Sequence, residues 1–151
     1  MKLKTIVTGT DFSEASLVAV EAAFNLDLEQ DGVLFLVHAV DPPAVFDPMG
    51  VGTLAWDELE SDVLAKLDQV IPSNPDRKFR VEKIALRGNP IEVLARVAVE
   101  KEADMIVVGT HGKSGLERVF LGSTAEGLLR KAPCQVLVAK HKMAGVSMAS
   151  E

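Results

Sequence analysis

The sequence predicts an α/β fold: a doubly wound, five-stranded parallel sheet of order 3-2-1-4-5 with helices on both faces. Two observations support this prediction. Apolar, β-branched runs alternate along the chain with stretches in which apolar residues recur every three or four positions. Two of these runs, residues 33–40 and 105–108, are almost continuously apolar, which is typical of strands covered on both faces. Alternating strands and helices with right-handed crossovers place helices on both sides of such a sheet.

Five strands are expected. They are "TIVTG" near Thr5, "VLFLVHAV" from Val33, "FRVEKIAL" from Phe79, "MIVVG" from Met105 and "QVLVA" from Gln135. The third alternates between apolar and polar residues, so we expect it nearer an edge of the sheet.

Four helices are expected between the strands, each with one apolar stripe. The stripes are Leu17, Val20, Phe24 and Leu28; Trp56, Leu59, Val63, Leu67 and Val70; Ile91, Leu94 and Ala98; and Ala125, Leu128 and Ala132.

Two of these helices carry start signals. For the third, Asn89 is the expected N-cap, Pro90 stands in the first turn and Glu92 completes a variant capping box. For the fourth, Ser123 and Glu126 are expected to form a Ser-x-x-Glu capping box.

The chain length and charge limit the functional classes. At 151 residues the chain has the length of one domain, expected over residues 1–140, with 141–151 as a flexible tail. The net charge of -6 argues against a general nucleic-acid binder. The absence of a long apolar run and of a signal-peptide pattern predicts a cytoplasmic protein that is not inserted in a membrane. The connection from Asp41 to Ala55 is too long and too rich in proline and glycine for a simple turn.

Ligands of a doubly wound sheet bind at the carboxyl ends of the strands, where the chain reverses direction between strands 1 and 4. Two loops meet there: "GTDFS" after the first strand and "GTHGKSGLERVFLGST", Gly109 to Thr124, after the fourth. The triplet Gly-Lys-Ser is not a Walker loop, because that pattern needs glycine at position 107, which is Val107. The Rossmann Gly-x-Gly-x-x-Gly pattern is absent after the first strand.

A different glycine spacing is present, Gly109-x2-Gly112-x9-Gly122-Ser123. It runs from a strand end to a helix start, so both ends of the loop are placed to offer backbone N–H groups to an anion. In the alternative interpretation the first two glycines form a turn and the last pair only begins a helix. The spacing alone leaves both interpretations open.

The segment "MIVVGTHGKSGLERVFLGSTAEGLLRKAPCQVLVAK" resembles the signature region of the universal stress proteins, in the ATP-binding branch with an intact Gly-x2-Gly-x9-Gly-Ser/Thr motif. The likeness continues through "IVTGTDFSEAS", "VHAVDPP" and "GNPIEVL" and covers Lys4 to Lys140. Gln135 departs from the family, in which a second proline is common there. The resemblance implies a Rossmann-like fold of the adenine nucleotide alpha hydrolase type.

The resemblance also implies ATP, accompanied by Mg²⁺, as the ligand. From the residues themselves no catalytic group is expected, and three scattered histidines with one cysteine give no transition-metal site made by the protein. Thr10 and Asp11 would lie near the adenosine or the metal-phosphate group, and the backbone of Ala39 and Val40 would contact adenine. The ribose and phosphates would be contacted by Gly109, His111, Gly112, Lys113, Gly122, Ser123 and Thr124. His38, on an apolar strand, is instead expected to be a core histidine with its hydrogen bonds satisfied.

Three functional hypotheses follow. The first is an ATP-binding stress-response or signalling module, and the second is a weak ATPase or phosphoryl-transfer enzyme, which would need a base and charge stabilisers at the γ-phosphate. The third is an interaction module in which the glycine loop is structural. We also expect a homodimer through the last strand, because an apolar edge strand tends to be paired or covered and the resemblance implies the same. The connection after the second strand is expected to cover the nucleotide or the dimer partner.

Overall fold

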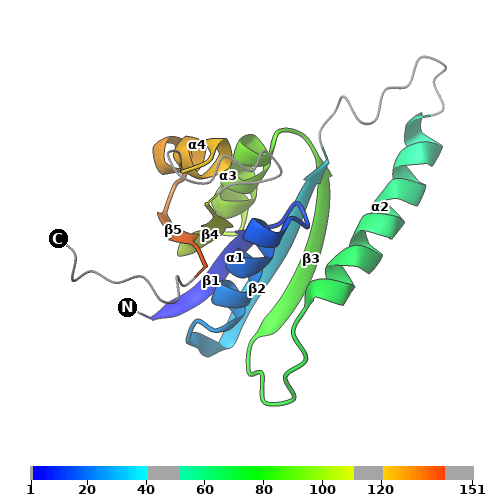
Figure 1. Cartoon of the computed structure of the whole chain (residues 1–151). Coiled ribbons are helices and arrows are strands. Elements are labelled where there is room, and N and C mark those ends of the chain that lie inside the picture. The colour runs from blue at the N-terminus through cyan, green and yellow to red at the C-terminus, as the bar shows by residue number, and fades with distance from the viewer. Residues whose placement is uncertain (1, 41–51, 111–120, 142–151) are drawn as a thin grey trace, which may run out of the picture.

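The computed structural model describes residues 2–40, 52–110 and 121–141 (Figure 1). Strands and helices alternate along the chain. They are β1 (Leu3–Gly9), α1 (Glu14–Phe24), β2 (Leu28–Val40), α2 (Gly52–Val70), β3 (Arg80–Arg87), α3 (Pro90–Glu100), β4 (Met105–Gly109), α4 (Ser123–Lys131) and β5 (Gln135–Ala139). The described strands form one parallel sheet of order β3-β2-β1-β4-β5. The predicted fold class and strand order are therefore confirmed, and "FRVEKIAL" does lie at an edge.

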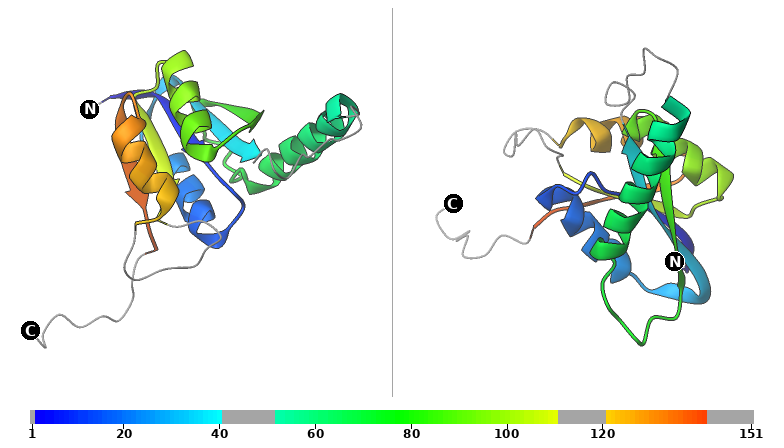
Figure 2. Two further views of the ribbon diagram at one scale, coloured as in Figure 1. Left: turned by 90° about the horizontal axis from the view of Figure 1, so that it is seen from above. Right: turned by 90° about the vertical axis from the view of Figure 1, so that its right-hand side faces the viewer.

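Helices cover both faces of the sheet, α1 and α2 on one side and α3 and α4 on the other (Figure 2). Because successive strand residues point to opposite faces, neighbouring residues of β1 enter different cores. Ile6 packs with Val20 of α1 and Leu67 of α2. Val7 packs with Leu94 of α3 and Leu128 of α4. No helix in the described ranges has both the length and the apolar composition needed to cross a bilayer.

The apolar stripe predicted for the first helix extends beyond the end of that helix. Leu28 continues the spacing of the first helix, but α1 ends at Phe24 with Asn25 as its C-cap, and Leu28 begins β2, where it pairs with Leu3. Leu28 is buried in the same core that α1 contacts. The spacing therefore predicted its burial correctly and its secondary structure wrongly, because a strand can bring an apolar side chain to the same core.

The long predicted connection is shorter than expected. Helix α2 begins at Gly52, so the last four residues of the segment 41–55 are helical. Residues 41–51 lie outside the described part of the chain, as do 142–151 of the predicted tail. The expectations that the connection covers a ligand and that the tail is flexible remain predictions.

The two predicted helix caps have different outcomes. Asn89 caps α3 as expected, with its side chain accepting from the Ile91 N–H at 2.9 Å and Pro90 in the first turn. The predicted Ser123 capping box is wrong, because the N-cap of α4 is Gly122, at φ +98°. Glycine reaches this positive φ without steric cost, so the helix begins one residue earlier than the Ser-x-x-Glu pattern suggests. Its first hydrogen bond joins the Glu126 N–H to the Gly122 carbonyl at 3.0 Å.

Candidate functional site

A cavity lies at the carboxyl edge of the sheet, between the ends of β1, β2 and β4 and the first turns of α1, α3 and α4. Its volume is about 530 Å³, including the part open to solvent. The described lining residues are Gly9, Thr10, Asp11, Ser16, Val37, His38, Ala39, Pro90, Leu94, Val108, Gly109 and Thr124. Its place is the one expected for a ligand in a doubly wound sheet.

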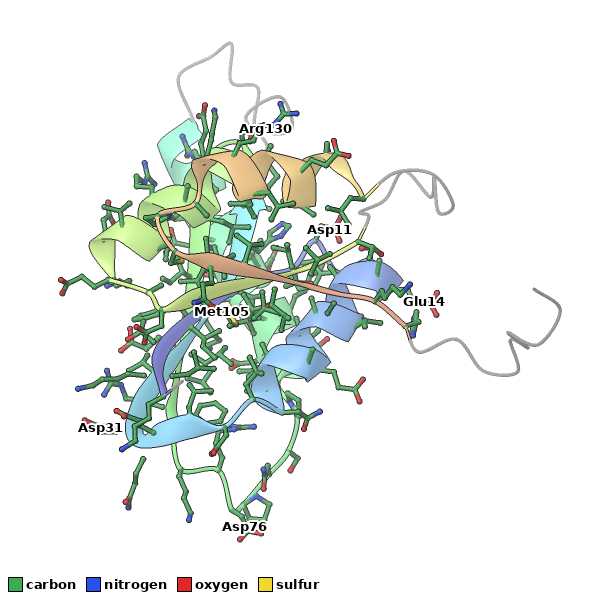
Figure 3. The ribbon with its side chains drawn as sticks, turned by 90° about the vertical axis from the view of Figure 1, so that its left-hand side faces the viewer. Asp11, Glu14, Asp31, Asp76, Met105 and Arg130 are labelled. Carbon is green, nitrogen blue, oxygen red and sulfur yellow. The ribbon has the colours of Figure 1, made fainter. Side chains whose placement is uncertain are left out.

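Five of the residues predicted to contact a nucleotide line this cavity: Thr10, Asp11, Ala39, Gly109 and Thr124. They come from four different elements or loops, so the fold does bring distant parts of the sequence together here. Asp11 lies beside the start of α1 and near the start of α4, away from Asp31 and Asp76 at the opposite end of the sheet (Figure 3).

The other residues predicted to contact the nucleotide are not among the described lining residues of the cavity. The Val40 side chain is buried in the core beneath the site, and its carbonyl accepts from the Gly88 N–H at 2.8 Å. Gly122 and Ser123 form the start of α4, next to Thr124, and are not among the described lining residues. His111, Gly112 and Lys113 lie outside the described residues.

Sequence reasoning missed seven lining residues. They are Gly9, Ser16, Val37, His38, Pro90, Leu94 and Val108. Strand position could have identified Val37 and Val108, since the carboxyl ends of central parallel strands border the ligand crevice. Leu94 belongs to a helix stripe, and the stripe indicates burial but not which buried residues face a cavity.

The loop after β1 is held by side-chain hydrogen bonds that converge on Ser16. Its Oγ donates to the Ser13 carbonyl at 3.0 Å and accepts from the Asp11 N–H at 3.2 Å. The buried Thr10 hydroxyl lies 2.8 Å from the same oxygen. The Asp11 carboxylate accepts from the Ser13 N–H at 2.9 Å, and Ser13 is the N-cap of α1. These bonds fix the carboxylate between the end of a strand and the start of a helix.

Phe12 adopts a strained backbone conformation in this loop. Its φ of +65° lies in the left-handed region, which is uncommon for an aromatic residue. Its N–H donates to Thr10 Oγ1 at 3.0 Å, and its ring centroid lies 4.8 Å from that of His38. Such strain persists only where surrounding contacts hold it, and it is concentrated at functional sites.

His38 differs from its expected role. Its ring is hydrogen-bonded, as predicted, since Nδ1 lies 2.8 Å from the Thr10 carbonyl oxygen. The side chain is only half-buried and lines the cavity wall rather than the core. A histidine on an apolar strand was expected inside, but the carboxyl end of a strand opens onto the crevice.

Gly109 has a structural reason to be glycine. An added Cβ would lie 2.5 Å from the carbonyl oxygen of Ala15 and 3.2 Å from the Ser16 nitrogen, both in the backbone of α1. The close approach of α1 to β4 therefore excludes a side chain here. For this glycine the structural interpretation of the motif is supported whatever the cavity binds.

The start of α4 has features of an anion site. Thr124, in its first turn, lines the cavity, and the first-turn N–H groups of a helix have no partner within the helix. The positive end of the helix dipole adds to the attraction for an anion.

Replacing Ser16 tests the hydrogen-bond network. We expect Ser16→Ala to lower the free energy of unfolding by about 1–2 kcal/mol, because the buried Thr10 hydroxyl and the Asp11 N–H lose their acceptor. Urea denaturation measures the change. Ser61→Ala, on the exposed side of α2, is the matched control and should stay within about 0.5 kcal/mol of the parent. Equal midpoints for both variants would show that the network contributes nothing to stability.

The described ranges contain two further kinds of chemistry-bearing group, possible metal ligands and Cys134. No cluster of three or more histidine, cysteine, aspartate or glutamate side chains there could hold a metal ion. Burial, together with the negative charge of Asp104, raises the pKa of the half-buried Cys134 thiol. A raised pKa disfavours the reactive thiolate, so Cys134 is best described as a packing residue.

Known proteins resemble most of the chain. A family model described as "Universal stress protein family" matches residues 2–140. Universal stress protein MJ0531 of Methanocaldococcus jannaschii is 37% identical over 139 residues, which cover 91% of this chain and 82% of that protein. Universal stress protein MJ0577 of the same organism is 30% identical over 158 residues, covering 92% and 96%.

Solved structures share the fold. The structure of MJ0577 matches with a TM-score of 0.81 at 27% identity, covering 94% of this chain and 99% of that one. A universal stress protein in complex with cAMP matches with a TM-score of 0.57 at 23% identity, covering 91% and 97%.

Proposed function

The chain belongs to the universal stress protein family, and on this premise we propose that it binds ATP in the cavity at the carboxyl edge of the sheet. In this proposal the bound nucleotide, accompanied by Mg²⁺, controls a stress-response or signalling module. The observation that carries the proposal is the composition of the cavity wall. One part is apolar and the other offers polar groups and a helix start, as a nucleotide requires.

The apolar part suits a base. Its lining residues are Val37, Pro90, Leu94 and Val108. Ala39 also lines the cavity, and in this proposal its backbone meets the edge of the purine. Ligand sites commonly combine such an apolar surface with a few well-placed polar groups. The fold-level likeness to a universal stress protein in complex with cAMP supports an adenine nucleotide as the class of ligand.

The polar part suits phosphates and their metal ion. Thr124 lies in the first turn of α4, and Gly122 before it takes a φ that only glycine adopts easily. Asp11 is the one carboxylate among the described lining residues. Mg²⁺ is commonly held by phosphate oxygens and one or two carboxylates, so Asp11 fits the ion that would accompany ATP. The ion would neutralise phosphate charge, and this chain would supply the carboxylate and the helix start.

Mass spectrometry of the gently purified, then denatured protein tests the proposal directly. We expect ATP, or ADP derived from it, to be released in a ratio near one per chain. Stripped protein should regain ATP in a calorimetric titration with Mg²⁺. Protein that carries no nucleotide and takes up none would reject the proposed function. Turnover that persists on repurification and falls in Asp11→Asn would instead support a weak ATPase.

We also propose that the chain forms a homodimer through β5. This strand is at the edge of the described sheet, and Val136, Leu137, Val138 and Ala139 are only partly buried. Apolar edge strands are usually paired or covered. Light scattering at tens of micromolar should give twice the chain mass of 16.2 kDa. A mass equal to one chain would contradict this edge model.

A further inference from the structure

We propose that His38 is a positioning residue, which holds Asp11 in the cavity wall by fixing the two residues on either side of it. The inference rests on the proposed nucleotide site for the function of Asp11, and on the contacts within this loop for the way in which Asp11 is held. His38 lies on β2, whereas Asp11 follows β1. The contact therefore joins two strand ends at the place where the ligand crevice opens.

The first contact fixes Thr10. A carbonyl oxygen can only accept, so the 2.8 Å contact between His38 Nδ1 and the Thr10 oxygen requires the proton on Nδ1. The Thr10 N–H in turn donates to the Val37 carbonyl at 2.9 Å. Both backbone polar groups of Thr10 are thus bound to β2, one through the backbone and one through the imidazole. The residue before Asp11 has no freedom to rotate away from the strand.

The second contact fixes Phe12. Its ring lies against the His38 ring, with the centroids 4.8 Å apart and the planes tilted by 47°. Phe12 holds a φ of +65°, so packing on its ring helps to maintain a conformation that the backbone does not favour. The ammonium group of Lys66 also lies over the Phe12 ring, 5.6 Å from its centroid. Asp11 therefore stands between two residues that one imidazole contacts in different ways.

This arrangement has a consequence for the carboxylate. With Thr10 and Phe12 held, Asp11 keeps the turn in which its Oδ1 accepts from the Ser13 N–H at 2.9 Å. Loss of the Nδ1–H donor releases the Thr10 carbonyl and lets the turn open more often. The protection of the Ser13 amide is thus a direct measure of how well His38 positions Asp11, and it does not depend on any ligand.

Two variants separate the donor from the ring. His38→Asn keeps an N–H donor close to the position of Nδ1 and loses the ring, while His38→Phe keeps a ring against Phe12 and loses the donor. We expect Ser13 amide exchange to become about tenfold faster in His38→Phe and to stay nearer to the parent in His38→Asn. The amides of Ile106 and Val107, in the buried strand β4, are the internal control for global unfolding and should be unchanged in both.

Nucleotide affinity provides the second measurement. For Mg-ATP we expect the dissociation constant to be about tenfold larger in His38→Phe than in the parent. In His38→Asn most of the affinity should be retained. If the parent protein binds no ATP, the proposed function fails, and the exchange of the Ser13 amide still decides the role of His38. Equal Ser13 protection in the parent and in His38→Phe would overturn the inference. So would an imidazole ¹⁵N spectrum showing the proton on Nε2 instead of Nδ1.

Discussion

Gly122→Val is expected to abolish the stabilisation of the folded chain by Mg-ATP. Gly122 is the N-cap of α4 at φ +98° and ψ 144°, which a β-branched residue adopts only with strain. The strain costs about 1–3 kcal/mol or moves the first turn of α4 away from the phosphates. At about a hundred times its dissociation constant ATP stabilises the parent by about 2.7 kcal/mol. Thermal melts should therefore show a rise of about 5–10 °C in the parent and none in the variant.

The control must impose similar strain away from the site. Glu102 also has a positive φ, +52°, and lies between α3 and β4 at the other end of the sheet. Glu102→Val should lower the melting temperature while keeping the full rise with ATP. A folded Gly122→Val protein whose midpoint rises as much as the parent's would show that the glycine segment is a structural turn.

The spacing of apolar residues predicted the fold, because the burial of apolar side chains decides where most strands and helices form. Residues such as Ile6, Leu67 and Leu128 are fully buried where the apolar stripes and runs place them. The same reasoning failed at Leu28, since two kinds of element can bury one side chain in one core. The capping-box pattern failed at Ser123, because it says nothing about the φ of the preceding glycine.

The candidate site was only partly predictable from the sequence. Strand topology indicated the crevice, and Thr10, Asp11, Gly109 and Thr124 do line it. The role of His38 was not predictable, because it depends on a contact with Thr10 across two strands. Long-range contacts of this kind are a property of the register, which apolar spacing does not specify.

Gly109→Ala is expected to destabilise the fold by about 3 kcal/mol, whether or not a nucleotide is present. The new Cβ would lie 2.5 Å from the Ala15 carbonyl oxygen and 2.9 Å from the Ala15 carbonyl carbon. Backbone cannot rotate out of the way as a side chain can, so α1 must move away from β4. The movement carries Ser16, whose hydroxyl holds the loop that positions Asp11. ATP affinity should therefore fall together with stability, in contrast to the selective loss expected for Gly122→Val.

Gly127→Ala is the matched control for this effect. Gly127 lies in the middle of α4, and an added Cβ there would meet the Ile91 side chain rather than backbone. The Ile91 side chain can shift, and alanine in a helix interior is favoured over glycine by about 0.8–1.0 kcal/mol, so the two effects oppose each other. Urea denaturation should show a free energy of unfolding within about 1 kcal/mol of the parent for Gly127→Ala and a much larger loss for Gly109→Ala. If the Gly109→Ala variant proves as stable as the parent, α1 can withdraw from β4 at no cost. The first glycine of the motif would then owe its identity to the ligand and not to the packing of α1.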